Sequence, residues 1–263
     1  MDQSTLERVQ ATQRAYDRQV SIIRDRVTSA VSQYWGSLRA YRDADITAFV
    51  DAVLPIIAAG KSTVSGLTLA YLTQVRATVE STPMALAPVG DMTDLRGVPS
   101  AEVYRRPGKT VYSALASGKS LDAAAAEGLA RAVSLAQTDL QLAKTHTVAR
   151  SGLRWFRRTL SGAENCALCA IASTQRYYRG DLMPIHPGCD CGVMEVFSER
   201  DPGQVIDDAT LEMVHAEVEA FVGVSDRGGR VPDYRNLIIT REHGEYGPTL
   251  AWRSQKFTGP TDF

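Results

Sequence analysis

The four cysteines of the chain form two pairs that lie close together in the sequence. Cys166 and Cys169 make a C-x2-C motif, and Cys189 and Cys191 make a C-x-C motif that follows His186. Two cysteine pairs separated by about 15 to 20 residues are typical of a tetrahedral zinc site, where thiolates and neutral imidazoles are the ligands. The sequence therefore predicts a structural zinc ion with five candidate ligands for four positions.

The spacing favours the four cysteines over His186. A C-x2-C turn directs both of its sulfurs at one centre, and residues two apart in an extended segment, such as Cys189 and Cys191, face the same way. Pro187 fixes the chain direction at His186 and turns it toward an arginine-rich segment nearby. We expect four thiolates to bind the ion, with His186 beside the site or exchanging with a cysteine.

Other uses of the same cysteines remain open. The chain begins without a signal-peptide pattern, and thiols stay reduced in the cytosol, so we favour zinc over two disulfides. A reversible dithiol site and free buried thiols are the remaining alternatives. A catalytic zinc would need an open coordination position and a nearby base, and the nearby carboxylates are only Asp181, Asp190 and Glu195.

Composition sets broad limits on the protein. The chain has 263 residues, a formal net charge of -1 and 44% hydrophobic residues, which is enough for a real core without a global attraction to nucleic acid. We expect no membrane span, because no apolar run approaches about 18 residues. A soluble protein of a reducing compartment is therefore expected.

Helical periodicity dominates the first 150 residues. The apolar stripe of the first segment is narrow, which fits packing on the core of its own domain or against another copy. Ser4 is the expected N-cap of this segment. Pro55 and the small residues after it are expected to interrupt the second helical region. The expected helices cover residues 4–40, 43–55, 67–83, 103–117 and 120–151, with an irregular connector over 83–100.

The character of the sequence changes at Arg150. Four arginines up to Arg158 have spacings that fit one face of a helix, with Trp155 and Phe156 beside them. We interpret this face either as a solvent-exposed helix face or as a surface that binds phosphates or an acidic partner. Two short strands are expected around the cysteines. Further strands are expected at 193–197, 237–240 and 249–252, a helix at 208–222 and a flexible loop from Asp226 to Asp233.

These expectations define a mainly α fold, with a long helical N-terminal half followed by a small α+β module that zinc holds together. The predicted domains are a helical domain over residues 1–150, a zinc-binding module over 151–200, and a helix and short strands over 201–263. No complete catalytic motif is recognisable. His146 and His215 are expected on helix faces, while His243 lies between two glutamates in a glycine-rich turn.

The cysteine region resembles that of Mu F-type phage head-morphogenesis proteins, which are minor capsid proteins of tailed phages. The similarity covers roughly residues 150–200, and the tail over 242–259 is similar to that of such proteins in phages of actinobacteria. Asp190 departs from the family pattern, which usually has a basic residue there. The residues that carry the resemblance are Cys166, Cys169, Pro184, His186, Pro187, Cys189 and Cys191.

The resemblance implies a minor head protein that is made in the bacterial cytoplasm and incorporated in few copies inside the phage head, near the portal. Its partners would be the portal protein, the scaffold protein, the major capsid protein and packaged double-stranded DNA, with no membrane. The alternative function is a capsid maturation protease, with Ser225 or a cysteine as nucleophile and His215 or His243 as base. A metal-dependent nuclease is the third reading. Its histidine motif is incomplete around His186, so a non-enzymatic protein is favoured.

Overall fold

A computed structural model describes residues 2–81, 85–160, 166–178, 189, 191–197, 208–223 and 234–259. Over these residues the chain is mainly helical, with a small strand-containing module in its C-terminal part, so the predicted fold class is confirmed. The helices are α1 (Gln3–Gly36), α2 (Asp43–Glu80), α3 (Ser100–Ala116), α4 (Leu121–Arg150), α5 (Ala167–Ser173) and α6 (Asp208–Val222). The strands are β1 (Trp155–Thr159), β2 (Arg176–Tyr178), β3 (Gly192–Glu195), β4 (Ile238–His243) and β5 (Gly247–Trp252).

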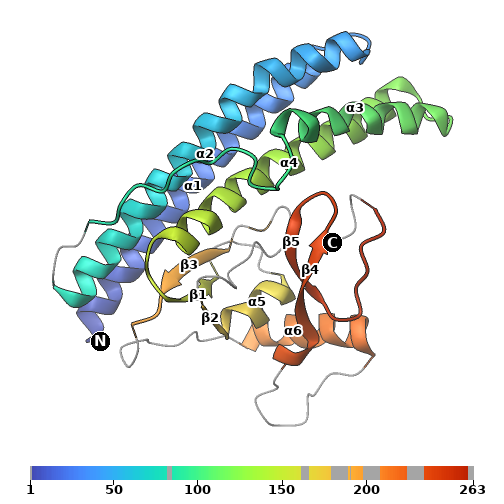
Figure 1. Ribbon diagram of the computed structural model, residues 1–263. Coiled ribbons are helices and arrows are strands. Elements are labelled where there is room, and N and C mark those ends of the chain that lie inside the picture. Colours follow the sequence, from blue (N-terminus) through green and yellow to red (C-terminus); the bar gives the residue numbers. More distant parts are fainter. Residues whose placement is uncertain are drawn as a thin grey trace.

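Helices α1 to α4 form two long hairpins that pack side by side, and the module lies against the α4 side of this bundle (Figure 1). The cap of α1 is Asp2, whose carboxylate accepts a hydrogen bond from Thr5 N at 2.7 Å. Ser4, the expected cap, lies inside the first turn. Ser120 caps α4 as predicted by accepting from Ala123 N.

Helix α2 runs without a break through the region where an interruption was expected. Pro55 lies on its exposed face, so the carbonyl that loses its helical donor is on the solvent side, where water can replace it. Gly60 is buried instead of forming a bend. A Cβ there would lie 2.8 Å from a methyl of Val27 and 3.1 Å from one of Leu140, so glycine permits α1, α2 and α4 to approach closely.

Because α2 is continuous, it forms one long apolar helix where two shorter helices were expected. Among the described residues it is the one helix long and apolar enough to cross a membrane, with a mean hydropathy of 1.4 in its most apolar 18-residue window. A core helix of a soluble protein meets the same criterion, and α2 packs against α1, α3 and α4. Length and composition therefore do not decide its environment.

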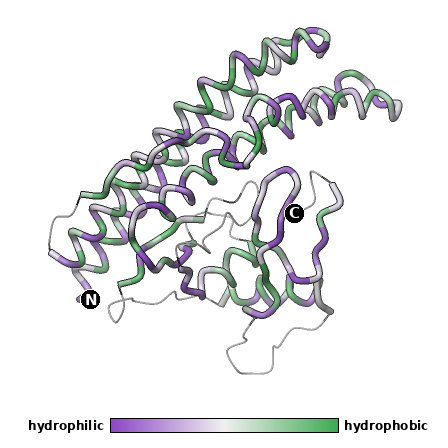
Figure 2. Tube along the Cα trace, in the orientation of Figure 1, coloured by the Kyte–Doolittle hydropathy of each residue, from purple (hydrophilic) through white to green (hydrophobic). Residues whose placement is uncertain are grey.

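Two hydrophobic cores lie along the bundle, and α1, α2 and α4 contribute residues to both of them. Hydrophobic and hydrophilic residues alternate along these helices (Figure 2). The distal core contains Trp35, Phe49, Tyr104 and Leu135. The module core combines helix residues with residues of the cysteine region, and so continues across residue 150, where the sequence analysis places a domain boundary. Its members include Val9, Tyr16, Tyr71, Leu72, Val75, Val148, Phe156, Cys169, Tyr177, Cys191 and Trp252.

The arginine-rich segment is a strand, and the expectation of a helical face was wrong. Gly152, with φ +84, ends α4 just after Arg150, because glycine readily adopts the left-handed conformation that follows many helix ends. Strand β1 then lies in the centre of an antiparallel sheet with the order β2-β1-β3. The strand period of two sends neighbouring side chains to opposite faces, and both Arg157 and Arg158 are buried.

The predicted C-terminal strands form a hairpin, β4–β5, which is held on the bundle by an ion cluster. Glu245 in its turn accepts two hydrogen bonds from Arg131 of α4, at 2.7 and 2.6 Å, and one from Arg106 of α3 at 3.0 Å. The hydroxyls of Tyr246 and Ser134 lie 3.1 Å apart beside it. This ion cluster joins the β4–β5 hairpin to helices α3 and α4.

Candidate metal centre

The first cysteine pair lies at the start of helix α5. Cys166 is the N-cap of this helix, and its sulfur accepts a hydrogen bond from Cys169 N at 3.4 Å. A turn between two strands was expected here, and the short apolar sequence Ala167–Ser173 instead forms two turns of helix whose residues are all buried. The helix positions both sulfurs on one side of its first turn, as the C-x2-C motif predicts.

The second pair precedes strand β3 and brings its sulfurs to the first. The sulfur of Cys169 lies 3.0 Å from that of Cys189 and 3.2 Å from that of Cys166. The sulfurs of Cys169, Cys189 and Cys191 all lie within 4.8 Å of one another. All four cysteines are free thiols. Three cysteines are thus close enough to bind one metal ion, and Cys166 adjoins them.

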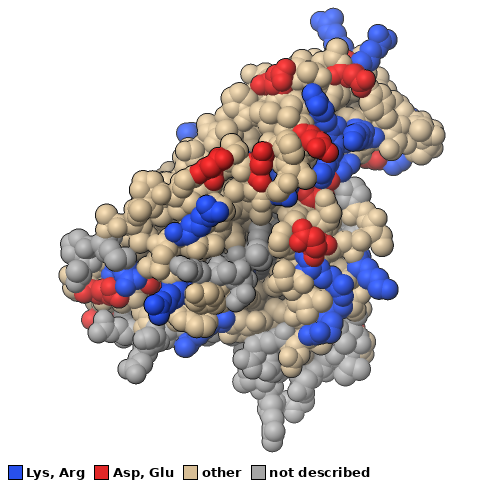
Figure 3. Space-filling view, viewed as in Figure 1, with Lys and Arg blue, Asp and Glu red and all other residues tan. Residues whose placement is uncertain are grey.

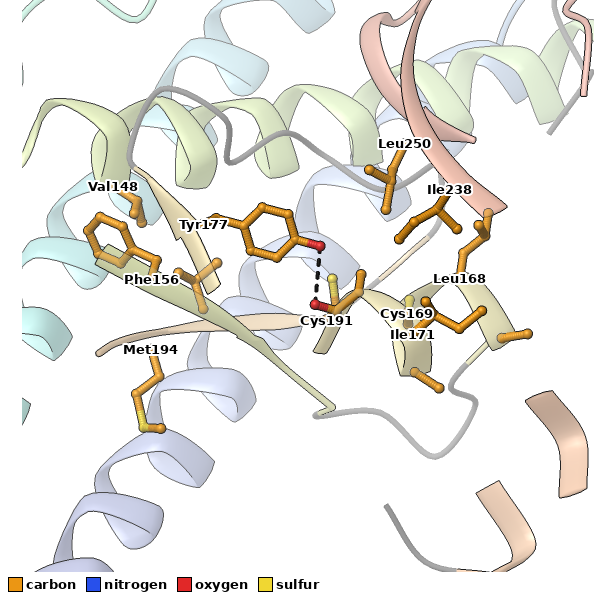
Figure 4. Close-up of a cluster of buried hydrophobic side chains, with 14 of the residues drawn as sticks. Val148, Phe156, Leu168, Cys169, Ile171, Tyr177, Cys191, Met194, Ile238 and Leu250 are labelled. Atoms are coloured by element: carbon orange, nitrogen blue, oxygen red, sulfur yellow. Dashed lines mark hydrogen bonds between the residues drawn. The ribbon is translucent and has the colours of Figure 1, made fainter. Parts of the chain in front are cut away.

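The donor set fits a tetrahedral thiolate site. Four sulfurs bound at about 2.3 Å around a zinc ion lie about 3.8 Å apart. The hydrogen-bonded sulfurs of Cys166, Cys169 and Cys189 are somewhat closer together than that, and rotation of their side chains would open space for an ion. Figure 4 shows Cys169 and Cys191 within the apolar cluster formed with Leu168, Ile171 and Tyr177. Such a dry site disfavours unpaired thiolates and favours their binding to a cation.

Two buried cations surround Cys191. Arg158 of β1 donates from Nη1 to the Cys191 sulfur at 3.4 Å, and Lys144 of α4 donates from Nζ to the Cys191 carbonyl oxygen at 2.7 Å. Hydrogen bonds from Cys169 and Cys189 hold the pKa of Cys191 well below its usual value, and the charges of Arg158 and Lys144 act in the same direction. The surroundings of the Cys191 sulfur therefore favour its ionised form.

The pKa of Cys169 shifts in the opposite direction to that of Cys191, whereas the pKa of Lys144 is lowered. The hydrogen bond with Cys166 is the largest cause of the raised pKa of the Cys169 thiol, and the hydrogen bond with Cys189 acts in the same direction. Burial lowers the pKa of Lys144, although the charges of Cys191 and Cys189 oppose that shift. A divalent cation would displace the thiol protons and satisfy the same sulfurs.

The sequence predicted the convergence of the cysteines, but not Lys144. Arg158, from the arginine-rich segment, contacts the sulfur of Cys191. Lys144 lies in a stretch of alanine, leucine and threonine in α4 and is buried in the structure, and no local sequence pattern distinguishes it from an exposed helix lysine. His186, Pro187 and Asp190 lie outside the described residues, so the role of His186 stays a prediction.

His215 and His243 have structural partners. His215, expected on a helix face, is buried in α6, and its Nδ1 lies 2.6 Å from the hydroxyl of Tyr234. His243 is also buried, and its Nδ1 accepts the backbone N–H groups of Glu245 and Tyr246. These contacts fix the hairpin turn. Ser225, the nucleophile considered with these histidines, lies outside the described residues.

Comparison of the chain with family models, with curated proteins and with solved structures finds no match. The resemblance of the cysteine region to Mu F-type proteins therefore rests on the motifs of the sequence.

Proposed function

We propose that the cysteine cluster binds one zinc ion, which holds the C-terminal module in its folded form. The observation that carries the proposal is the convergence of Cys169, Cys189 and Cys191 within 4.8 Å, with Cys166 next to them. Zinc prefers four sulfur or nitrogen ligands in a closed site of this kind. Four thiolates would carry excess negative charge, and Arg158 and Lys144 lie where they offset it. The ion would be structural, because it would join the first turn of α5 to the segment that precedes β3.

Metal analysis of the purified chain tests this proposal. We expect about one zinc per chain, and we expect Cys169→Ser to lose it, because Cys169 lies next to two of the other sulfurs. His186→Ala is the matched ligand test: retention of zinc would support four cysteines, and its loss would place the histidine among the ligands. A folded protein without metal, with all four thiols open to titration, would contradict the proposal.

We propose further that the chain is a minor head protein of a tailed phage, which acts in procapsid assembly near the portal. The support is the order of its sequence features: a helical half, an arginine-rich segment, C-x2-C and H-P-x-C-x-C. A long helical bundle with a small metal-held module at its side suits an assembly protein that joins other subunits through extended surfaces. Portal, scaffold and major capsid proteins would be its partners, and packaged DNA would lie within its reach.

The composition of purified phage particles tests the second proposal. We expect mass spectrometry to find the chain in particles at a few copies each, and particles made without its gene to assemble or infect poorly. Absence of the chain from the particles would contradict a virion role. Specific cleavage of the major capsid or scaffold protein by the purified chain would instead support the maturation protease.

A further inference from the structure

Two aromatic side chains lie exposed at one end of the three-stranded sheet. Trp155 of β1 and Tyr178 of β2 are direct partners in the antiparallel register. Their rings lie 5.5 Å apart at 69°, and the residues are 49% and 41% exposed. Large aromatic side chains are normally among the first to be buried. A preformed pair on the surface therefore presents two ring faces or edges that a flat ligand can cover.

Positive charge accompanies this pair. Arg176 and Tyr178 stand two residues apart on β2 and so share one face of the sheet, while Arg154 directly precedes Trp155. Both arginines are exposed. Over residues 140–160 and 166–178 the chain contains basic residues but no aspartate or glutamate. This part of the described surface therefore differs from the bundle, where acidic and basic side chains alternate on the face shown in Figure 3.

The neighbouring acidic groups are already engaged. Glu195 of β3 accepts a hydrogen bond from Arg76 of α2 at 2.6 Å, and Arg76 also forms an ion pair with Glu80 at 3.1 Å. Both carboxylates thus share the guanidinium of Arg76 on the α2 side of the sheet. Two exposed arginines thus accompany the aromatic pair, on a chain with a formal net charge of -1.

We propose that Trp155, Tyr178 and Arg176, which share one face of the sheet, form a binding surface for single-stranded nucleic acid, with the exposed Arg154 next to it in the sequence. Bases stack on exposed aromatic rings whatever their sequence, and arginines bind the phosphates between them. A duplex hides the faces of its bases, so it offers these rings nothing to stack on. An acidic peptide would use the arginines but would not need the paired rings. The proposal depends neither on the metal nor on a role in the virion.

Tryptophan fluorescence gives a direct readout of this surface. Trp35 and Trp252 are 1% and 3% exposed, so Trp155 is the tryptophan that a ligand from solvent can reach. We expect a single-stranded oligothymidylate to quench the emission at low ionic strength, and we expect added salt to weaken the binding. Trp155→Phe should keep most of the binding, measured by the anisotropy of a labelled oligonucleotide, but lose the quenching.

Matched variants separate stacking and charge from general effects. Tyr178→Ala and Arg176→Ala should each weaken binding at least about fivefold. Tyr112→Ala and Arg105→Ala change an exposed tyrosine and an exposed arginine on α3, and should leave binding unchanged. The thermal unfolding of each variant shows whether it folds. Equal binding by Tyr178→Ala, equal affinity for a duplex, or binding of polyglutamate but not oligothymidylate would overturn the proposal, and the last result would identify an acidic protein segment as the partner.

Discussion

The guanidinium of Arg158 lies 3.4 Å from the sulfur of Cys191. Arg158 is in β1, which pairs with β3, and Cys191 directly precedes β3. Both residues are only 1% exposed. The same guanidinium lies 5.8 Å from the centre of the Tyr177 ring. A buried charge is costly unless an opposite charge accompanies it. Hydrogen bonds from Cys169 and Cys189 and the charge of Arg158 lower the pKa of Cys191, so the ionised sulfur is a partner for the guanidinium.

Replacing Arg158 should therefore weaken metal binding at the cysteines without removing a ligand. We expect Arg158→Met to raise the dissociation constant for zinc about 10- to 100-fold, the usual effect of changing a group that supports a metal ligand. Competition with a chromophoric chelator at constant pH measures this change. Arg154→Met removes an exposed arginine from the same segment and serves as the control. Equal losses in both variants would point to general electrostatics rather than the contact with Cys191.

The sequence predicted the helices and the C-terminal hairpin well because these elements depend on local signals. Ser120 caps α4 as expected, and the strands either side of Gly244 pair as expected. The helical pattern through Pro55 was misread, since an exposed proline can remain in a helix when packing holds both sides. Arg158 was placed on a helix because the arginine spacing fits both periods, and only pairing with β2 and β3 selects the strand.

In the candidate metal site, too, the sequence predicted the features that depend on local spacing and missed those that depend on tertiary packing. Cysteine spacing is local, so the sequence alone predicted that Cys166 and Cys169 approach Cys189 and Cys191. The cations that support them come from α4 and β1, and their approach depends on how the module packs on the bundle. Nothing in the sequence near Lys144 indicates that it contacts the Cys191 carbonyl. Ion clusters such as Glu245 with Arg131 also join distant segments, and no local pattern predicts them.

Removing the metal should loosen the two cores unequally. The module core includes Cys169 and Cys191 together with Val9 and Tyr71, whereas the distal core around Trp35 contains no cysteine. After chelation we expect faster hydrogen exchange in α5 and β3 and in the adjoining parts of α1 and α2. Amides around the distal core should stay protected. Uniform loss of protection would show that the bundle needs the metal as much as the module does.

Stability should fall as pH rises toward neutrality because of Glu195. Burial raises the pKa of Glu195 from 4.5 to about 7, and Arg76 only partly opposes this shift. Between these values the folded chain holds a proton that the unfolded chain has released. The contribution of this group to the free energy of unfolding is therefore fully present below about pH 4.5 and is lost as pH rises to about 7.

Glu195→Gln tests this contribution, because glutamine keeps the hydrogen-bond acceptor for Arg76 but does not titrate. Urea denaturation of both proteins across the interval should show the variant gaining stability relative to the wild type as pH increases. Glu80→Gln removes a charge that raises the Glu195 pKa, and should move the fall to lower pH. An NMR titration of the Glu195 carboxyl carbon with a midpoint near 4.5 would contradict the expectation.

Two glycines in helices should respond oppositely to alanine. A Cβ at Gly128 of α4 would lie 2.4 Å from a ring carbon of Trp35 and 2.8 Å from a methyl of Val111, while one at Gly66 of α2 meets no atom within 4 Å. Gly128→Ala should cost about 1–3 kcal/mol by overpacking the distal core. Gly66→Ala should add about 0.5–1 kcal/mol, because alanine loses less backbone entropy in a helix. Urea denaturation measures both, and a stable Gly128→Ala protein would mean that α4 does not pack this closely on Trp35.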